Sequence, residues 1–243
     1  YILYAEIDQF DPHDASWPAP VYTCMDRWVQ SKLQSLVQFV TTELDQYHIT
    51  EAARAIAGFV DELSNWYVRR SRDRFWGGER TADKSAAYRT LYQVLETLTR
   101  ICAPFVPFMT ESMYQNLVRS VDSSAPESVH LTTWPDVNLA AIDKDLEAQM
   151  ETALQLVVLG RSARNAAKVK NRQPLSRMLV QGAEPLSDEV QSIILDELNV
   201  KAFELADDAA SYVGYLVKPQ MKTLGPKYGK LLPKIGNHLK NGD

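Results

Sequence analysis

Apolar residues recur every three or four positions through most of the chain, the spacing at which side chains share one face of an α-helix. Four such stripes come before residue 121, and we expect their helices to begin near Asp26, Thr50, Asp83 and Pro107. An acidic residue, a threonine cap and a first-position proline all suit helix starts. Striped helices with short joints between them favour an antiparallel bundle.

Glycine and proline mark the expected helix ends. Gly77-Gly78 is expected to stop the second helix, because glycine adopts the left-handed conformation after a helix at little cost. Pro104 is expected to end the third helix. The residues of the fourth helix expected to face inward are Val106, Met109, Met113 and Leu117.

A fifth and longer helix is predicted from Asp143 to Pro174, after a Ser- and Pro-rich loop over residues 121–142. Beyond Pro174 the pattern changes to short apolar and β-branched runs around one helical stretch. The expected elements there are strands at 178–180, 201–205 and 212–217 and a helix at 187–198.

These patterns predict a mainly α fold, with an antiparallel helix bundle followed by a small α+β region. The expected organisation is an irregular entry segment over residues 1–21, a helical domain over 22–173 and the α+β region over 174–243.

Composition limits the class of protein. The chain has 243 residues, 45% of them apolar, and a net charge of −5, which argues against disorder throughout. Two cysteines, Cys24 and Cys102, form no disulfide framework and predict a reducing, cytoplasmic setting. The four histidines are scattered, so we expect no metal site, and no apolar stretch is long enough to predict a membrane span.

Positive charge is concentrated in three segments despite the acidic total. Residues 161–177 and 218–240 each carry six cations and no acid, and residues 69–80 carry five arginines against Asp73 and Glu79. Such segments suit an anionic partner, although a solvated surface is the ordinary alternative.

The face of the fifth predicted helix changes from apolar to cationic along its length. Its apolar face continues in register as Arg161, Arg164, Lys168 and Arg172, with Lys170 nearby. Burying an unpaired cationic face costs a large amount of free energy. We therefore expect the second half of this helix to leave the bundle and to contact a polyphosphate or solvent. The alternative is a helix end whose cations only complement the helix dipole.

The arginines at 69–74 lie among aromatic residues. Arg70 and Arg74 are four residues apart, Trp66 lies one turn before Arg70, and Trp76 follows. Guanidinium groups and aromatic rings together are suited to the phosphates and bases of single-stranded RNA. The alternative is a core aromatic with pairs to Asp73 within the helix.

Self-contained catalytic motifs are absent from the sequence. Residues 225–230 have the wrong glycine and lysine spacing for a phosphate-binding P-loop, and no GxSxG motif occurs. We therefore expect no catalytic residue, and these features alone predict a helical binding module with basic patches.

Several longer motifs together resemble one family, the eukaryote-like subgroup of class Ia isoleucyl-tRNA synthetases. Residues 65–76 read NWYVRRSRDRFW and residues 161–175 read RSARNAAKVKNRQPL, both similar to motifs of that family. CAPFVPF at 102–108, HLTTWP at 130–135 and TLGPK at 223–227 extend the resemblance over nearly the whole chain.

The resemblance implies a C-terminal fragment with the anticodon-binding domain. The family's HIGH and KMSKS signatures are absent, so the fragment should hold no cofactor, whereas the whole enzyme would use ATP and magnesium to join isoleucine to its tRNA. The implied partners are the anticodon stem-loop of isoleucine tRNA and the remaining domains of the synthetase, with no membrane. Alternatives are a helical protein-interaction scaffold and an RNA-binding module without anticodon preference.

The residues proposed to contact tRNA are those of the two basic segments and the tryptophans beside the first. They are Trp66, Arg69, Arg70, Arg72, Arg74, Trp76, Arg161, Arg164, Lys168, Lys170 and Arg172.

Overall fold

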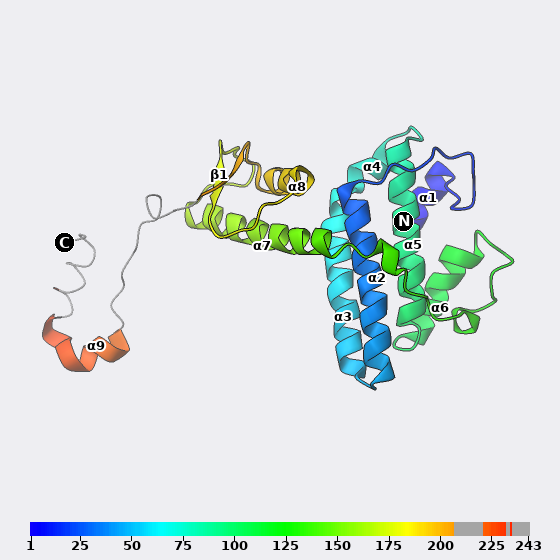
Figure 1. The fold of residues 1–243 in the computed structure, drawn as a ribbon, viewed down its shortest axis with the longest axis horizontal. Coiled ribbons are helices and arrows are strands. Elements are labelled where there is room, and N and C mark those ends of the chain that lie inside the picture. The colour runs from blue at the N-terminus through cyan, green and yellow to red at the C-terminus, as the bar shows by residue number, and fades with distance from the viewer. Residues whose placement is uncertain (207–220, 232–233, 235–243) are drawn as a thin grey trace. The chain divides into compact units, whose positions relative to one another are not determined.

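A computed structural model describes residues 1–206, 221–231 and 234. Helices dominate these residues, and the strands among them form one pair, so the prediction of a mainly α fold is confirmed (Figure 1). The strand expected at 212–217 lies outside the described residues.

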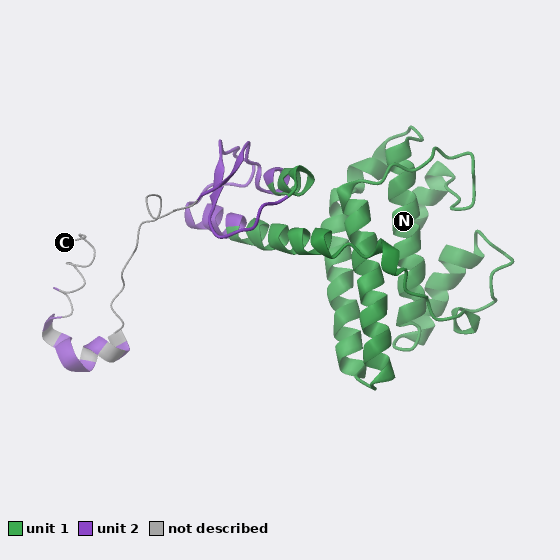
Figure 2. Cartoon of the chain, in the orientation of Figure 1, with its two compact units in different colours: residues 1–159, 187–194 green, residues 160–186, 195–243 purple. Residues whose placement is uncertain are grey.

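The chain forms two compact units (Figure 2). Unit 1 consists of residues 1–159 and 187–194, and unit 2 consists of residues 160–186 together with the chain from Leu195 onward. The first division between the units falls inside the fifth predicted helix, between Leu159 and Gly160.

Helix α2 (Cys24–Asp45) is the central helix of unit 1 and lies side by side with α3 and α5 (Figure 1). It begins with a capping box, in which Thr23 Oγ1 accepts the Asp26 N–H (3.3 Å) and the Asp26 carboxylate accepts the Thr23 N–H (2.8 Å). Its apolar stripe, including Trp28, Leu33 and Val37, is buried as the pattern predicts.

The second predicted helix is a broken one. It consists of α3 (Ile49–Glu62), a π-helical segment η1 (Leu63–Val68) and α4 (Arg72–Trp76). The helix begins at Ile49, so the expectation that Thr50 caps it is wrong. Gly77 ends it in an extended conformation (φ −64°, ψ 142°) and not in the left-handed one, and its carbonyl accepts a hydrogen bond from the Lys84 ammonium (2.5 Å).

Helices α5 (Ala82–Cys102) and α6 (Pro107–Tyr114) follow, and Pro107 opens α6 as predicted. A π-helical turn η2 (Gln115–Arg119) extends α6. The expected inward face of this helix is wrong at Val106 and Met109, which are exposed. Thr110 and Tyr114 are the buried residues of α6, and the Thr110 hydroxyl donates a hydrogen bond to the carbonyl of Val106, the residue before the helix (3.1 Å).

The entry segment is not irregular throughout, since residues Ile2–Asp8 form helix α1. Asp8 connects α1 to α5, because its carboxylate accepts hydrogen bonds from the Tyr88 hydroxyl and the Lys84 ammonium, both at 2.5 Å. Phe10 and Trp17 then pack on Tyr88 with ring centroids 4.6 and 5.8 Å away. An aromatic cluster therefore anchors the segment to α5.

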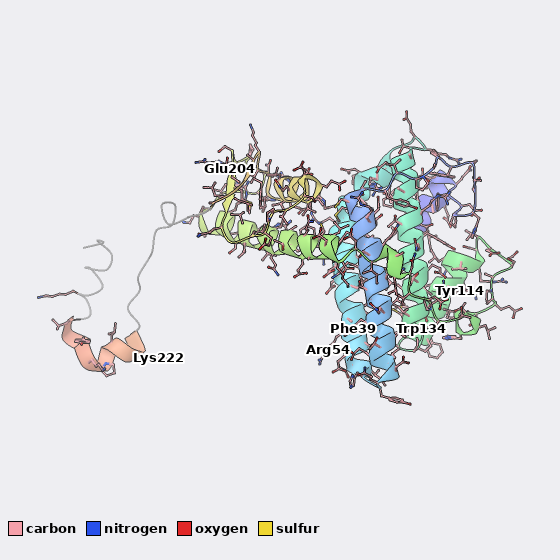
Figure 3. All side chains as sticks on the ribbon, viewed as in Figure 1. Phe39, Arg54, Tyr114, Trp134, Glu204 and Lys222 are labelled. Carbon is pink, nitrogen blue, oxygen red and sulfur yellow. The ribbon has the colours of Figure 1, made fainter. Side chains whose placement is uncertain are left out.

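Residues 121–142 form the predicted loop, with 3₁₀ turns η3 (Val129–Leu131) and η4 (Leu139–Ala141). Trp134, labelled in Figure 3, fixes the loop on α2 because its indole Nε1 donates to Thr41 Oγ1 (2.8 Å).

Helix α7 (Lys144–Ala166) begins where predicted, with Asp143 Oδ1 accepting the Leu146 N–H (2.9 Å). Glu147 ties its start to α2 by accepting hydrogen bonds from Ser31 and Ser35 (both 2.6 Å). Helix α7 ends at Ala166, however, eight residues before Pro174.

Unit 2 contains a small parallel strand pair, β1 (Met178–Val180) with β2 (Phe203–Leu205), in the register Met178↔Phe203. Helix α8 (Asp188–Leu198) connects the two strands along the chain. These three elements confirm the predictions for residues 178–205. Helix α9 (Met221–Tyr228) and the turn η6 (Gly229–Leu231) follow.

In the described part of the chain, no helix combines the length and the apolar character that crossing a membrane requires. Cys24 and Cys102 are both free thiols.

Candidate nucleic-acid interface

The arginine-rich segment of unit 1 has an inner side and an outer side. On the inner side, Arg74 makes a two-pronged pair with Asp26 of α2, in which Nη1 and Nη2 each donate to a carboxylate oxygen at 2.9 Å. Asp26 is fully buried and the Arg74 side chain is 13% exposed. The Tyr67 hydroxyl also donates to Asp26 (2.7 Å), so one carboxylate joins α2, η1 and α4.

Electrostatics at this pair follow from its burial. Desolvation alone raises the pKa of Asp26, but the hydrogen bonds and charge of Arg74 outweigh it, so the net pKa lies below its usual value. Burial and the adjacent carboxylate raise the pKa of Tyr67 well above its ordinary value, which keeps the phenol a hydrogen-bond donor. Asp83 supplies a second carboxylate to Arg74, with Nε to Oδ2 at 3.0 Å.

Arg74 therefore has a structural role, because its guanidinium is engaged inside unit 1. A guanidinium with five donors suits this position because it satisfies two carboxylates and the Asp83 carbonyl together. The sequence gives no sign of the pairing, since Asp26 lies 48 residues before Arg74.

The outer side of the segment carries the remaining predicted residues. The guanidinium of Arg69 lies over Trp66, 5.7 Å from the ring centroid. Arg69 Nε also donates to the Asn65 carbonyl (2.7 Å), which fixes this stacked pair on the helix surface. Arg70 is half-buried and has interactions of its own.

Arg72 and Trp76 border a hollow of about 310 Å³ beside α4. Both residues are exposed, with Trp76 at 60%. The other lining residues are mainly aromatic or aliphatic: Tyr1, Tyr4, Val68, Phe75 and Leu91. An exposed indole next to a guanidinium offers both a stacking surface and a phosphate contact.

The basic segment of unit 2 is a helix end and a turn, and not a continued helix. Lys168 adopts the left-handed conformation (φ 55°), its N–H bonds to the Asn165 carbonyl (3.1 Å), and the Val169 N–H bonds to the Arg164 carbonyl (2.9 Å). This pair of bonds is a Schellman motif, which ends α7. The expectation of one continuous cationic helix face to Arg172 is therefore wrong.

Arg164 is the second predicted contact residue with a structural role. It is 5% exposed, and its guanidinium donates to four backbone carbonyls. Nη1 donates to the carbonyls of Lys170 (3.1 Å) and Gln173 (3.0 Å), and Nη2 donates to those of Leu198 (2.5 Å) and Asn199 (3.1 Å).

Arg161 also has an internal partner. Its Nη2 lies 2.5 Å from Glu197 Oε2, a carboxylate whose side chain is 4% exposed, while Arg161 itself stays 44% exposed. The arginine thus compensates a carboxylate that is out of the solvent.

Lys168, Lys170 and Arg172 are exposed in the turn that follows α7. Among the described residues, none of the three is within ion-pair distance of a carboxylate. The nearby Arg177 does have one, since its Nη1 lies 3.5 Å from Glu204 of β2, which is labelled in Figure 3.

The structure thus collects the predicted residues into two clusters. Unit 1 carries Trp66, Arg69, Arg70, Arg72 and Trp76, and unit 2 carries Lys168, Lys170 and Arg172. Over residues 1–206, 221–231 and 234, no group of three or more His, Cys, Asp or Glu side chains is arranged to hold a metal ion. The third basic segment, residues 218–240, lies partly outside the described residues.

The chain is similar in sequence to known proteins over its whole length. A protein family described as the anticodon-binding domain of tRNA ligase matches residues 26–179. The isoleucine–tRNA ligases of Clostridium novyi and Clostridium acetobutylicum are each 50% identical over 243 residues, and isoleucine–tRNA ligase 2 of Bacillus cereus is 44% identical. The match covers 99–100% of this chain but 23% of each relative's length.

Proposed function

Because the chain belongs to the family of anticodon-binding domains of tRNA ligases, we propose that it holds the anticodon stem-loop of isoleucine tRNA for an isoleucine–tRNA ligase. The observation that carries the proposal is the 50% identity to such ligases over the whole chain. A helical interaction scaffold would not account for that identity.

In unit 1, the proposed contacts are to bases and phosphates of an unpaired loop. Trp76 and the Trp66–Arg69 pair supply flat surfaces on which bases stack, and Arg70 and Arg72 supply positive charge. RNA loops are recognised in this way because their bases are free to leave the stack.

In unit 2, the proposed contacts are to the RNA backbone. Lys168, Lys170 and Arg172 are exposed cations from a stretch of chain without acidic residues. Each phosphate that a cation neutralises releases counterions, so binding through them should weaken steeply with salt.

The chemistry of the ligase is proposed to reside in the rest of the protein, since the chain spans 23% of the length of the relatives. That part would use ATP and magnesium to attach isoleucine, with the present residues supplying tRNA recognition alone. The proposed setting is the cytoplasm, which suits a chain with two free thiols.

The test is filter binding of the 243-residue chain to an isoleucine tRNA transcript over a range of salt concentrations. We expect retention that falls linearly on a log–log plot against salt, and weaker retention of the same tRNA with its anticodon replaced. Base readers should contribute about 1–3 kcal/mol of this discrimination.

Two outcomes contradict the proposal. Equal retention of both transcripts would indicate an RNA-binding module without anticodon preference. No retention at low salt would leave a protein-interaction scaffold as the better account.

A further inference from the structure

Helices α7 and α8 both end inside unit 2, in the same way and close to one another. Helix α7 ends with Lys168 in the left-handed conformation, and α8 ends with Asn199 in it (φ 50°). In α8 the Asn199 N–H bonds to the Asp196 carbonyl (3.3 Å) and the Val200 N–H to the Leu195 carbonyl (3.0 Å), again a Schellman motif.

Side chains join these two ends into one structure. Arg164 donates to the Leu198 and Asn199 carbonyls at the end of α8 and to carbonyls of the turn after α7. The Asn199 side chain returns the link by donating to the Asn171 and Arg172 carbonyls (3.3 and 3.0 Å). The turn over residues 167–173 is therefore held from both sides through its backbone.

This arrangement leaves the cationic side chains of the turn out of the internal bonding. The backbone carbonyls of Lys170 and Arg172 are engaged, whereas their side chains are exposed. The negative ends of two helices converge here, and Arg164 is the buried cation that compensates them. The three exposed cations are not required for that purpose.

Lys168 provides an independent indication. A residue with a side chain at φ 55° is strained relative to glycine, which is the usual residue at this position of a Schellman motif. A lysine here places an exposed charge where glycine would be less strained, which points to a use for that charge outside the fold.

We infer that Arg164 is a positioning residue for RNA binding: by bonding the carbonyls of both helix ends, it holds Lys168, Lys170 and Arg172 in place as a preformed site for RNA phosphates. The inference rests on the proposed function, since it names how the same tRNA is held. It replaces a direct contact by Arg164 with an indirect one.

Salt dependence gives the expected magnitudes. One phosphate contact changes the log–log slope by about 0.7–0.9, which corresponds to roughly five- to eightfold in affinity at 0.1 M salt relative to 1 M. Loss of three contacts should therefore weaken binding roughly 100- to 500-fold at 0.1 M salt and lower the slope by about 2–3.

The first experiment compares the wild-type chain with K168G, using the isoleucine tRNA transcript. Glycine relieves the backbone strain, so the variant should fold at least as stably while binding about fivefold or more weakly with a slope lower by about one. R177Q is the matched control, because it removes an exposed cation of the same unit that already has a carboxylate partner. Unchanged affinity and slope in K168G would overturn the inference.

The second experiment tests Arg164 itself with R164K, alone and in the triple variant K168Q/K170Q/R172Q. Lysine keeps the charge but cannot span four carbonyls, so R164K should weaken tRNA binding as the triple variant does. Added to the triple variant, R164K should cause no further loss. A further loss would mean that Arg164 contacts RNA directly. A loss in R164K alone that comes with unfolding of unit 2 would mean that Arg164 is only a structural residue. Either result overturns the positioning role.

The two hypotheses fail in different ways. If the wild-type chain retains no tRNA, the proposed function fails. If wild type binds and R164K binds equally well, only the role of Arg164 fails.

Discussion

Removal of the Arg74 guanidinium is expected to destabilise unit 1 strongly. In Arg74→Ala the fully buried Asp26 keeps its charge but loses a two-pronged partner, and the Tyr67 hydroxyl and Thr23 remain as its donors. Removing one side of a buried ion pair costs about 3–5 kcal/mol in the free energy of unfolding, because the other charge stays buried.

The same substitution should make stability depend on pH in a defined direction. Without Arg74, the effect of burial is no longer offset by the guanidinium, so we expect the pKa of Asp26 to rise above its unfolded value and the folded variant to bind a proton more readily than the unfolded chain. The loss is therefore greatest near neutral pH and shrinks as the pH falls through the raised pKa. Asp26→Asn in the Arg74→Ala background should recover part of the loss at neutral pH, because no buried charge is left.

Tryptophan fluorescence during urea unfolding is a suitable assay, since all five tryptophans belong to unit 1. Arg72→Ala is the matched control, an exposed arginine of the same helix that should change stability by no more than about 0.5 kcal/mol. A loss below about 1 kcal/mol for Arg74→Ala, or an equal loss at acid and neutral pH, would refute the reasoning.

Three further predictions follow from other features. Trp76→Ala should weaken tRNA binding by about 1–3 kcal/mol without loss of stability, because the indole is 60% exposed; equal binding would remove it from the contact set. Gly160→Ala should destabilise unit 2 by about 1–3 kcal/mol, seen as faster amide exchange over 195–206, because a Cβ would lie 2.4 Å from Leu198 Cδ1; unchanged exchange would contradict this. The pKa values of Asp26 and Glu147 in the folded protein are both depressed, so wild-type unit 1 should lose stability below about pH 4. In the variant D26N/E147Q, the free energy of unfolding from the same fluorescence assay should depend less on pH in this range.

The helices were predictable because their apolar periodicity is a local property. Trp28, Leu33 and Val37 are buried as their spacing indicates, and Pro107 opens its helix for a reason contained in one residue. The mistakes at Val106 and Met109 come from a helix too short for its periodicity to decide which side faces inward.

The candidate site was harder to predict because tertiary contacts divide its arginines. Arg69 and Arg74 are neighbours in one motif, yet Arg74 pairs with a buried carboxylate from α2 whereas Arg69 lies over Trp66. The prediction that Arg164 and Lys168 share one helix face assumed that α7 continues past Lys168, but Lys168 adopts a positive φ and the helix ends before it. Neither Asp26 nor the Asn199 carbonyl can be assigned to its arginine from sequence spacing.

The interleaving of the two units has a consequence for the order in which the chain is made. Residues 187–194 complete unit 1, where Glu189 pairs with Arg27 at 2.5 Å and the Ser187 N–H bonds to Gln149 (2.8 Å). During translation, the ribosome must therefore release residues 160–186 before the final piece of the first unit emerges. Nascent unit 1 stays unfinished until a large part of its neighbour has been synthesised, so the two units mature in overlapping periods rather than one after the other.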